Sequence, residues 1–205
     1  MKTVGVIGGG SWATALVKIL CNNFAQVNWF VRREDQVAHI LRYKHNPTYL
    51  QSVEFDLNQI HVSNDLEEII KRSDVLIVAT PSAFLVELFK DTTPELFKGK
   101  VVFSAVKGIV PEYNAIPARF FHKTFGTPYK DIGIICGPCH AEEVALERLS
   151  YLTVACQHEG IAAEMARMLA CRYIKTTTSD DLFGTELSAV LKNVYALASG
   201  ICAGL

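Results

Sequence analysis

Residues 3–13 read Thr3-Val4-Gly5-Val6-Ile7-Gly8-Gly9-Gly10-Ser11-Trp12-Ala13, and a helical pattern of apolar residues follows over residues 14–20. This is the spacing G-x-G-x-x-A, placed where an apolar strand turns into a helix. At such a turn Gly8 allows the tight bend, Gly10 lets a pyrophosphate approach bare backbone, and Ala13 lets the helix pack closely on the sheet. The alternative is a glycine-rich turn that binds nothing. The strand and helix on either side favour a dinucleotide site at the start of the chain.

Short β-forming runs alternate with helical patterns along most of the chain. The runs are Thr3–Gly8, Val27–Arg32, Gln59–Val62, Val75–Ala79, Val101–Val106, Gly133–Cys136 and Leu152–Cys156. The helical patterns between them are Trp12–Asn23, Glu34–Tyr43, Leu66–Arg72, Ala83–Lys90 and Ala162–Ala170. Several runs are continuously apolar, as strands buried on both faces are. This order predicts an α/β fold with a Rossmann-like, doubly wound and mostly parallel sheet.

The pattern changes near Ser179, and Glu186–Leu205 reads as one helix with no strand after it. Its apolar residues form one stripe at the helical period, and Lys192 lies nearly opposite that stripe among small residues. A lysine in that position either reaches solvent along its aliphatic stem or serves a functional cleft. We expect residues 1–178 to form a dinucleotide-binding domain and residues 179–205 to begin a second, helical domain.

Composition narrows the class of protein. The 205 residues include 20 Lys and Arg against 21 Asp and Glu, without a basic block, so a nucleic-acid partner is not expected. Six scattered cysteines are typical of reduced thiols rather than of a disulfide scaffold. Three glycines interrupt the apolar start too early for a signal peptide, and no uninterrupted apolar run reaches the ~18–20 residues of a membrane span. We therefore expect a cytoplasmic protein without a membrane span.

Positive charges end two of the predicted strands. Arg32 and Arg33 follow the second strand, where an acid commonly holds the ribose of NAD, and two guanidinium groups there suit the 2′-phosphate of NADP. The alternative is that they only begin the next helix at the surface. Lys107 ends a strand where ligands bind in such sheets, so it is either a contact for a phosphate or carbonyl or a surface lysine. Tyr49 either stacks on a base or fills the core. The expected cofactor is NADP or NAD, with NADP favoured.

The segment Cys136-Gly137-Pro138-Cys139 follows a predicted strand and precedes a helix with acids in its first turn. Its letters are those of a thioredoxin-type redox motif, in which a helix N-terminus activates a thiol. A dithiol redox protein is therefore an alternative function, although no aromatic residue directly precedes Cys136. A zinc site with both thiols and His140 lacks a clear further pair of ligands. The same segment serves equally as an anion cradle.

Taken in order, six motifs give the chain a resemblance to the bacterial type of NAD(P)-dependent glycerol-3-phosphate dehydrogenase. These motifs are Gly8–Leu16, His45–Leu50, Ala79–Ser82, Ser104–Ile109, Gly137–Ala145 and Glu186–Val194. The resemblance implies interconversion of sn-glycerol 3-phosphate and dihydroxyacetone phosphate, which feeds phospholipid synthesis. It implies a small phosphorylated substrate as partner, and a homodimer is compatible with it.

The resemblance also implies roles for residues of this chain. The cofactor-binding residues would be Gly8, Gly10, Ser11, Trp12, Arg32, Arg33, Tyr49, Lys107 and Ala141. The substrate-binding residues would be Lys107, Gly137, Cys139, Lys192 and Asn193. Lys192 would be the catalytic proton-transfer residue, and Lys107, also catalytic, would be the second cation that favours the neutral form of Lys192. No metal is implied.

Two positions depart from the family pattern. Ala13 stands where the family mostly has glycine, and Cys139 stands where it has serine or threonine, although a thiol is the weaker hydrogen-bond donor. Family members continue through a whole helical domain, so the resemblance implies an N-terminal fragment that binds cofactor and does not turn over substrate by itself. A non-catalytic dinucleotide-binding module is the remaining alternative.

Overall fold

The computed structural model describes residues 2–204, so Met1 and Leu205 lie outside the described residues. Within them the chain forms eight strands in one sheet, with the order β3-β2-β1-β4-β5-β6-β7-β8. The strands are β1 Val4–Ile7, β2 Val27–Phe30, β3 Ile60–Ser63, β4 Val75–Val78, β5 Val101–Ser104, β6 Ile132–Cys136, β7 Ser150–Cys156 and β8 Ile174–Ser179. The first six follow the Rossmann order and are parallel. The predicted mostly parallel, doubly wound sheet is confirmed.

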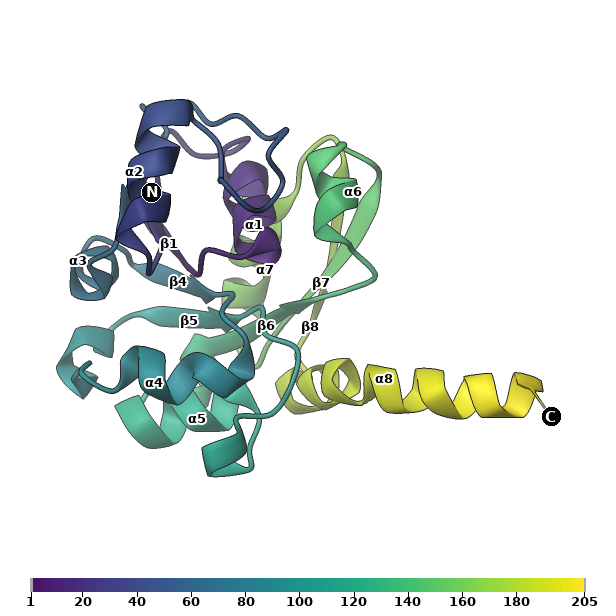
Figure 1. Ribbon diagram of the computed structural model, residues 1–205. Helices are drawn as coiled ribbons and strands as arrows, with labels where there is room; N and C mark the ends of the chain where they lie inside the picture. The colour runs from purple at the N-terminus through teal and green to yellow at the C-terminus, as the bar shows by residue number, and fades with distance from the viewer. Residues whose placement is uncertain (1, 205) are drawn as a thin grey trace.

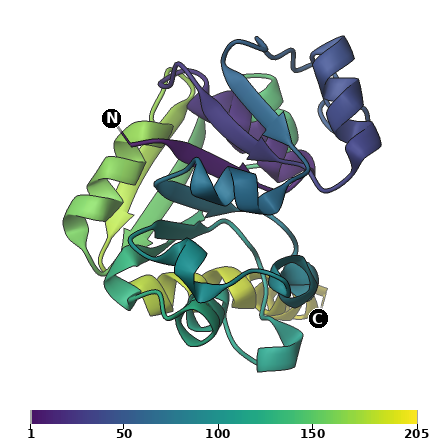
Figure 2. The same cartoon turned by 90° about the vertical axis from the view of Figure 1, so that its left-hand side faces the viewer.

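Helices cover both faces of this sheet (Figure 1). The α-helices are α1 Ser11–Leu20, α2 Glu34–Tyr43, α3 Leu66–Lys71, α4 Leu85–Phe89, α5 Pro117–Phe125, α6 Ala141–Ala145, α7 Glu159–Leu169 and α8 Leu182–Gly204. One apolar cluster joins α1 and α7 to one face of the sheet, and a second joins α3, α4, α5 and the start of α8 to the other. Figure 2 shows the molecule turned by 90° from Figure 1. In this view the strands are seen to twist, and α7, in light green, lies alongside the sheet. Because β1, β2, β4 and β5 are buried along their whole length, their largely apolar sequence is explained.

The sheet extends further than the sequence predicted. Strand β8 was not expected, and it pairs in parallel with β7, while β7 runs antiparallel to β6. The sequence Ile174-Lys175-Thr176-Thr177-Thr178-Ser179 lies at an edge of the sheet and is mostly exposed or half-buried. An edge strand needs fewer apolar residues than a central one, so the apolar signal was too weak to mark it. Helix α5 was also not expected, since it begins at Pro117 and is rich in aromatic residues.

Helix α8 begins at Leu182, four positions before the predicted start. The Asp181 carboxylate accepts a hydrogen bond from the backbone N–H of Gly184 at 2.7 Å and so satisfies the first turn. Most of α8 then leaves the body of the molecule (Figure 1). By length and composition α8 is apolar enough to cross a membrane, and none of its most apolar window is buried. One such helix is weak evidence for a span, and Glu186 and Lys192 had interrupted the apolar run in the sequence.

Candidate functional site

The glycine turn after β1 is held by side chains that bind its carbonyl groups. Each bond comes from a different element: Trp29 Nε1 donates to Gly8 O at 2.8 Å, Gln36 Nε2 to Gly9 O at 2.8 Å, Asn46 Nδ2 to Gly9 O at 3.1 Å, and Thr14 Oγ1 to Gly10 O at 2.9 Å. Asn46 is fully buried, and its Oδ1 accepts from the backbone N–H groups of Thr48 and Tyr49. These contacts fix the conformation of the turn before any ligand arrives.

The surroundings of Gly8 leave no room for a side chain, whereas those of Gly10 do. Gly8 has φ +142°, and a Cβ on it would lie 2.9 Å from Ala79 O, so the fold itself excludes a side chain there. Gly10 has φ −84°, and a Cβ on it would meet nothing within 4 Å in the described part of the chain. The space over Gly10 is therefore open. Over residues 2–204, no side chain caps the N-terminus of α1 and no acid lies in its first turn, so its N–H groups suit an anion.

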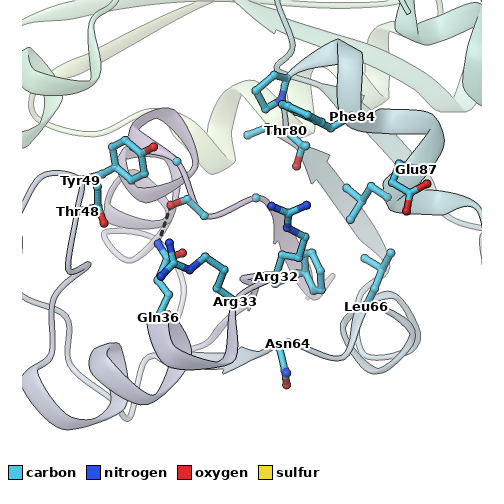
Figure 3. A pocket seen from close by; sticks show the side chains of 17 residues that line it. Arg32, Arg33, Gln36, Thr48, Tyr49, Asn64, Leu66, Thr80, Phe84 and Glu87 are labelled. Atoms are coloured by element: carbon cyan, nitrogen blue, oxygen red, sulfur yellow. Dashed lines mark hydrogen bonds between the residues drawn. The ribbon is translucent and has the colours of Figure 1, made fainter. Parts of the chain in front are cut away.

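A first cavity of about 580 Å³ lies where the strand order reverses, between the ends of β1 and β4. This is where open α/β sheets bind ligands. The glycine turn lines it, together with Arg32, Arg33, Tyr49, Thr80 and Phe84, which are labelled in Figure 3. Arg33 pairs with Asp35 through Nε at 2.9 Å and through a second, short contact, which lowers the pKa of the Asp35 carboxyl. In residues 2–204, no acid pairs with Arg32.

A second cavity continues from the first, and a third continues from the second. The second, about 340 Å³, shares residues 79–81 with the first, and Ser11, Trp12, Lys107, Cys139 and Ala141 also line it. The third, about 480 Å³, shares Lys107 with the second and extends along α8 to Lys192, with Gly137 in its wall. The three cavities therefore form one path from the arginines to α8.

The path collects nearly all the residues named from the sequence. Asn193 is the exception, because it is exposed on α8 and lines none of the three cavities. Lys192 lines the third cavity but is exposed, so the expected burial around it is not provided by the described residues. The reason is that α8 projects away from the sheet at this point. Cys139 is buried, with 5% of its surface exposed.

The two thiols of the Cys136-Gly137-Pro138-Cys139 segment do not have the character of a redox pair. All six cysteines among the described residues are free thiols. Burial raises the pKa of both the Cys136 and the Cys139 thiol, which is opposite to the lowered pKa of a reactive dithiol. Helix α6 after them has only five residues. Across residues 2–204, no group of three or more His, Cys, Asp or Glu residues is placed to hold a metal ion.

The sequence alone did not identify Gln36 and Asn46 as part of the site. Asn46-Pro47 carries a turn signal, and an asparagine before such a turn commonly binds nearby backbone N–H groups, as Asn46 does. Its bond to Gly9 O joins positions 37 residues apart, so the sequence carried no signal for it.

Comparison with known proteins gives a consistent relationship. A family model described as the N-terminus of NAD-dependent glycerol-3-phosphate dehydrogenase matches residues 3–162. Glycerol-3-phosphate dehydrogenases [NAD(P)+] of Bacillus velezensis and Syntrophotalea carbinolica are 32% and 33% identical over 100% and 98% of this chain. The chain spans 59% and 61% of the length of these two relatives.

Solved structures show the same fold. A glycerol-3-phosphate dehydrogenase of Plasmodium falciparum has a TM-score of 0.87 at 24% identity, with 99% of this chain and 59% of that chain covered. The enzyme of Coxiella burnetii has a TM-score of 0.86 at 22% identity, with 99% and 61% covered. Since the family model extends over more than half of the residues, this chain belongs to the family of NAD-dependent glycerol-3-phosphate dehydrogenase N-terminal regions.

Proposed function

We propose that the chain is the cofactor-binding part of an NAD(P)-dependent glycerol-3-phosphate dehydrogenase, which interconverts sn-glycerol 3-phosphate and dihydroxyacetone phosphate. The observation that carries the proposal is Gly10, a glycine that the fold does not need, beside an uncapped helix N-terminus. Bare backbone at this place serves a pyrophosphate that must come close. The names of the relatives support the same activity.

The cofactor would follow the path of cavities. The glycine turn and the start of α1, with Ser11 and Trp12, would hold its pyrophosphate, and Arg32, Arg33 and Tyr49 would hold its adenosine half. Two guanidinium groups favour the 2′-phosphate and hence NADP. The nicotinamide end would lie beside Lys107 and Ala141. When bound, the cofactor supplies the hydride acceptor or donor.

The substrate would occupy the third cavity. Lys107 would neutralise its phosphate or polarise its carbonyl, with Gly137 and Cys139 at its border. Lys192 would take the proton of the hydroxyl during oxidation and return it during reduction, with Asn193 beside it on α8. In this proposal residues 1–178 form the dinucleotide domain and residues 179–205 begin the helical one. The enzyme would act in the cytoplasm, as a homodimer, and supply phospholipid synthesis.

Tryptophan fluorescence tests the cofactor claim. The chain has two tryptophans, of which Trp12 lines the second cavity and Trp29 binds the glycine turn. We expect NADPH and NADH to quench this fluorescence. We expect Gly10→Ala to weaken both affinities at least about tenfold, because its methyl group takes space that the pyrophosphate needs. Since a Cβ at Gly10 meets no described atom within 4 Å, the melting temperature should fall only slightly, by the amount that alanine costs at a helix N-cap.

A matched control is Gly200→Ala, another glycine whose Cβ meets no described atom within 4 Å, on α8 outside the path. Its nucleotide affinity should equal that of the unaltered chain. No quenching by either nucleotide, or an unchanged affinity in Gly10→Ala, would overturn the proposed function.

A further inference from the structure

Glu186 is a buried carboxyl with no role in the function proposed above. It lies in the first part of α8, fully buried, six positions before Lys192. Within residues 2–204, it forms no ion pair. A charged side chain in such a place carries a large desolvation cost, so the fold retains it against that cost. The surroundings of its carboxyl group indicate what it does there.

The first oxygen connects α8 to α5. Glu186 Oε2 accepts a hydrogen bond from the backbone N–H of Ala118 at 3.2 Å. Ala118 is the second residue of α5, whose N-terminus has no side-chain cap of its own among the described residues. Glu186 therefore caps α5 from a position 68 residues away, and this cap ties the base of α8 to the body of the molecule.

The carboxyl of Glu186 also lies near the end of β5. Glu186 Oε1 is buried and has no hydrogen-bond partner in the described part of the chain. The hydroxyl of Ser104, the last residue of β5, is near enough to favour the charged form of the carboxyl. Ser104 Oγ in turn accepts from the backbone N–H of Val106 at 3.3 Å, one residue before Lys107. The carboxyl thus stands between the helix that carries Lys192 and the turn that carries Lys107.

We propose that Glu186 is a positioning residue that holds Lys107 and Lys192 on one wall of the third cavity. This inference rests on the proposed function, because it takes those two lysines as the residues that face the substrate. Glu186 acts through the Ala118 amide and the Ser104 turn and touches no substrate itself. A glutamine of the same shape keeps an acceptor for Ala118 and gains a donor for Ser104, so it should preserve the arrangement.

The pKa of the carboxyl agrees with a role in hydrogen bonding rather than in charge. Burial raises the pKa of Glu186 to about 7, and the Ala118 N–H and the Ser104 hydroxyl offset part of that effect. In the protonated form, the carboxyl can donate a hydrogen bond, which the charged form cannot. Cys136, the other titratable group near it, is a thiol whose pKa burial and Glu186 both raise.

The test compares Glu186→Ala, Glu186→Gln and Leu182→Ala in the 205-residue chain. Leu182 is buried in the first turn of α8 through apolar contacts, so its truncation loosens the helix without removing a carboxyl. The readouts are hydrogen exchange at the Val106 amide and the yield of a Lys107–Lys192 cross-link with a short amine-reactive reagent. Acylation of each lysine alone serves as the control for reactivity.

We expect Glu186→Ala to lose most of the cross-link and to speed exchange at Val106 about tenfold, because the Ser104 hydroxyl that binds the Val106 amide loses the carboxyl beside it and becomes free to move. Glu186→Gln should keep both near the unaltered values, and Leu182→Ala should lower the melting temperature while it keeps the cross-link. Unchanged readouts in Glu186→Ala, no rescue by glutamine, or an equal effect of Leu182→Ala would overturn the inference. Quenching of the unaltered chain by nucleotide is measured separately. If no quenching occurs, the proposed function is wrong, but the cross-link and hydrogen exchange of the variants still test the role of Glu186.

Discussion

Arg32 and Arg33 are adjacent in the sequence and unequal in the structure. Asp35 binds Arg33 in a bidentate pair, and across residues 2–204 no acid pairs with Arg32. To bind a 2′-phosphate, Arg33 must first leave Asp35, whereas Arg32 need not leave an ion pair. We therefore expect Arg32→Ala to weaken NADPH binding about tenfold and Arg33→Ala to weaken it less. The measurement is a fluorescence titration with NADPH and NADH.

The affinity for NADH is the internal control, since NADH lacks the 2′-phosphate and should bind both variants nearly as it binds the unaltered chain. Asp35→Asn releases Arg33 and should raise NADPH affinity. Equal losses in the two arginine variants, or an equal loss of NADH binding, would contradict this account of the two arginines.

Glu186 makes the stability of the fold depend on pH. Its folded-state pKa, about 7, lies above the ordinary value of 4.5. A raised pKa stabilises the fold at low pH, and this contribution falls as pH rises from about 4.5 and is lost above about 7. We expect the free energy of unfolding of the unaltered chain to fall from pH 5 to pH 8 by about 2.5 kcal/mol relative to Glu186→Gln. Urea unfolding at several pH values measures this difference.

Taking the difference between the two proteins cancels the titration of the other groups. The thiol of Cys136, whose pKa Glu186 helps to raise, stays neutral over this range. A difference that stays constant with pH would show that the carboxyl titrates as an ordinary exposed one.

At the scale of single residues, the sequence predicted the positions of residues that belong to one short motif. Gly8, Gly10 and Arg32 belong to a turn and a strand end, and their places follow from the order of strands. Asn46 binds the glycine turn across 37 residues, and Glu186 binds the start of α5 across 68 residues, through bonds that no short pattern records. Buried polar residues that join distant elements are therefore what the sequence alone could not assign.

At the scale of elements, apolar signal decided what could be predicted. The central strands are buried on both faces and were found, whereas β8 lies at the edge and was missed. The reversal of β7 relative to β6 was also missed, because an apolar run does not state its direction. Whether two consecutive strands run parallel depends on the segment that connects them, because a parallel pair needs a long crossover. Between β6 and β7 the described chain has only the short helix α6, which accords with the antiparallel pairing.

The junction of β5, β6 and β7 has little room, which gives a prediction for β6. A Cβ on Gly133 would collide with the ring of Phe103 and lie 2.9 Å from Ala155 O. We expect Gly133→Ala to lower the free energy of unfolding by about 1–3 kcal/mol, because the neighbouring strands must move apart. Urea unfolding measures it, with Gly200→Ala as control. That helical glycine has open space around it, so its alanine should stabilise α8 slightly. Equal free energies of unfolding for the two variants would mean that the strands at this junction can move apart without loss of stability.

At the scale of the whole molecule, the candidate site depends on a helix that the rest of the described chain leaves bare. No described residue of α8 lines the first or the second cavity, but α8 forms one side of the third. Val194, Leu197 and Ile201 on that helix are 58%, 67% and 56% exposed. They recur at helical spacing and make one apolar stripe, and stripes of this kind are normally covered in solution.

We therefore expect the 205-residue chain to self-associate through α8. Its weight-average mass in analytical ultracentrifugation should rise with protein concentration, and the double variant Val194→Glu, Leu197→Glu should remain monomeric. The matched control is Leu41→Glu, which changes a residue 49% exposed on α2, far from the stripe in the sequence. It should associate like the unaltered chain. Sedimentation with neutral lipid vesicles tests the alternative, that a lipid surface covers the stripe instead of a second copy of the chain. One outcome would contradict self-association: all the proteins are monomeric without vesicles, and only the double variant fails to sediment with vesicles. In that case the stripe binds lipid, and self-association through α8 is wrong.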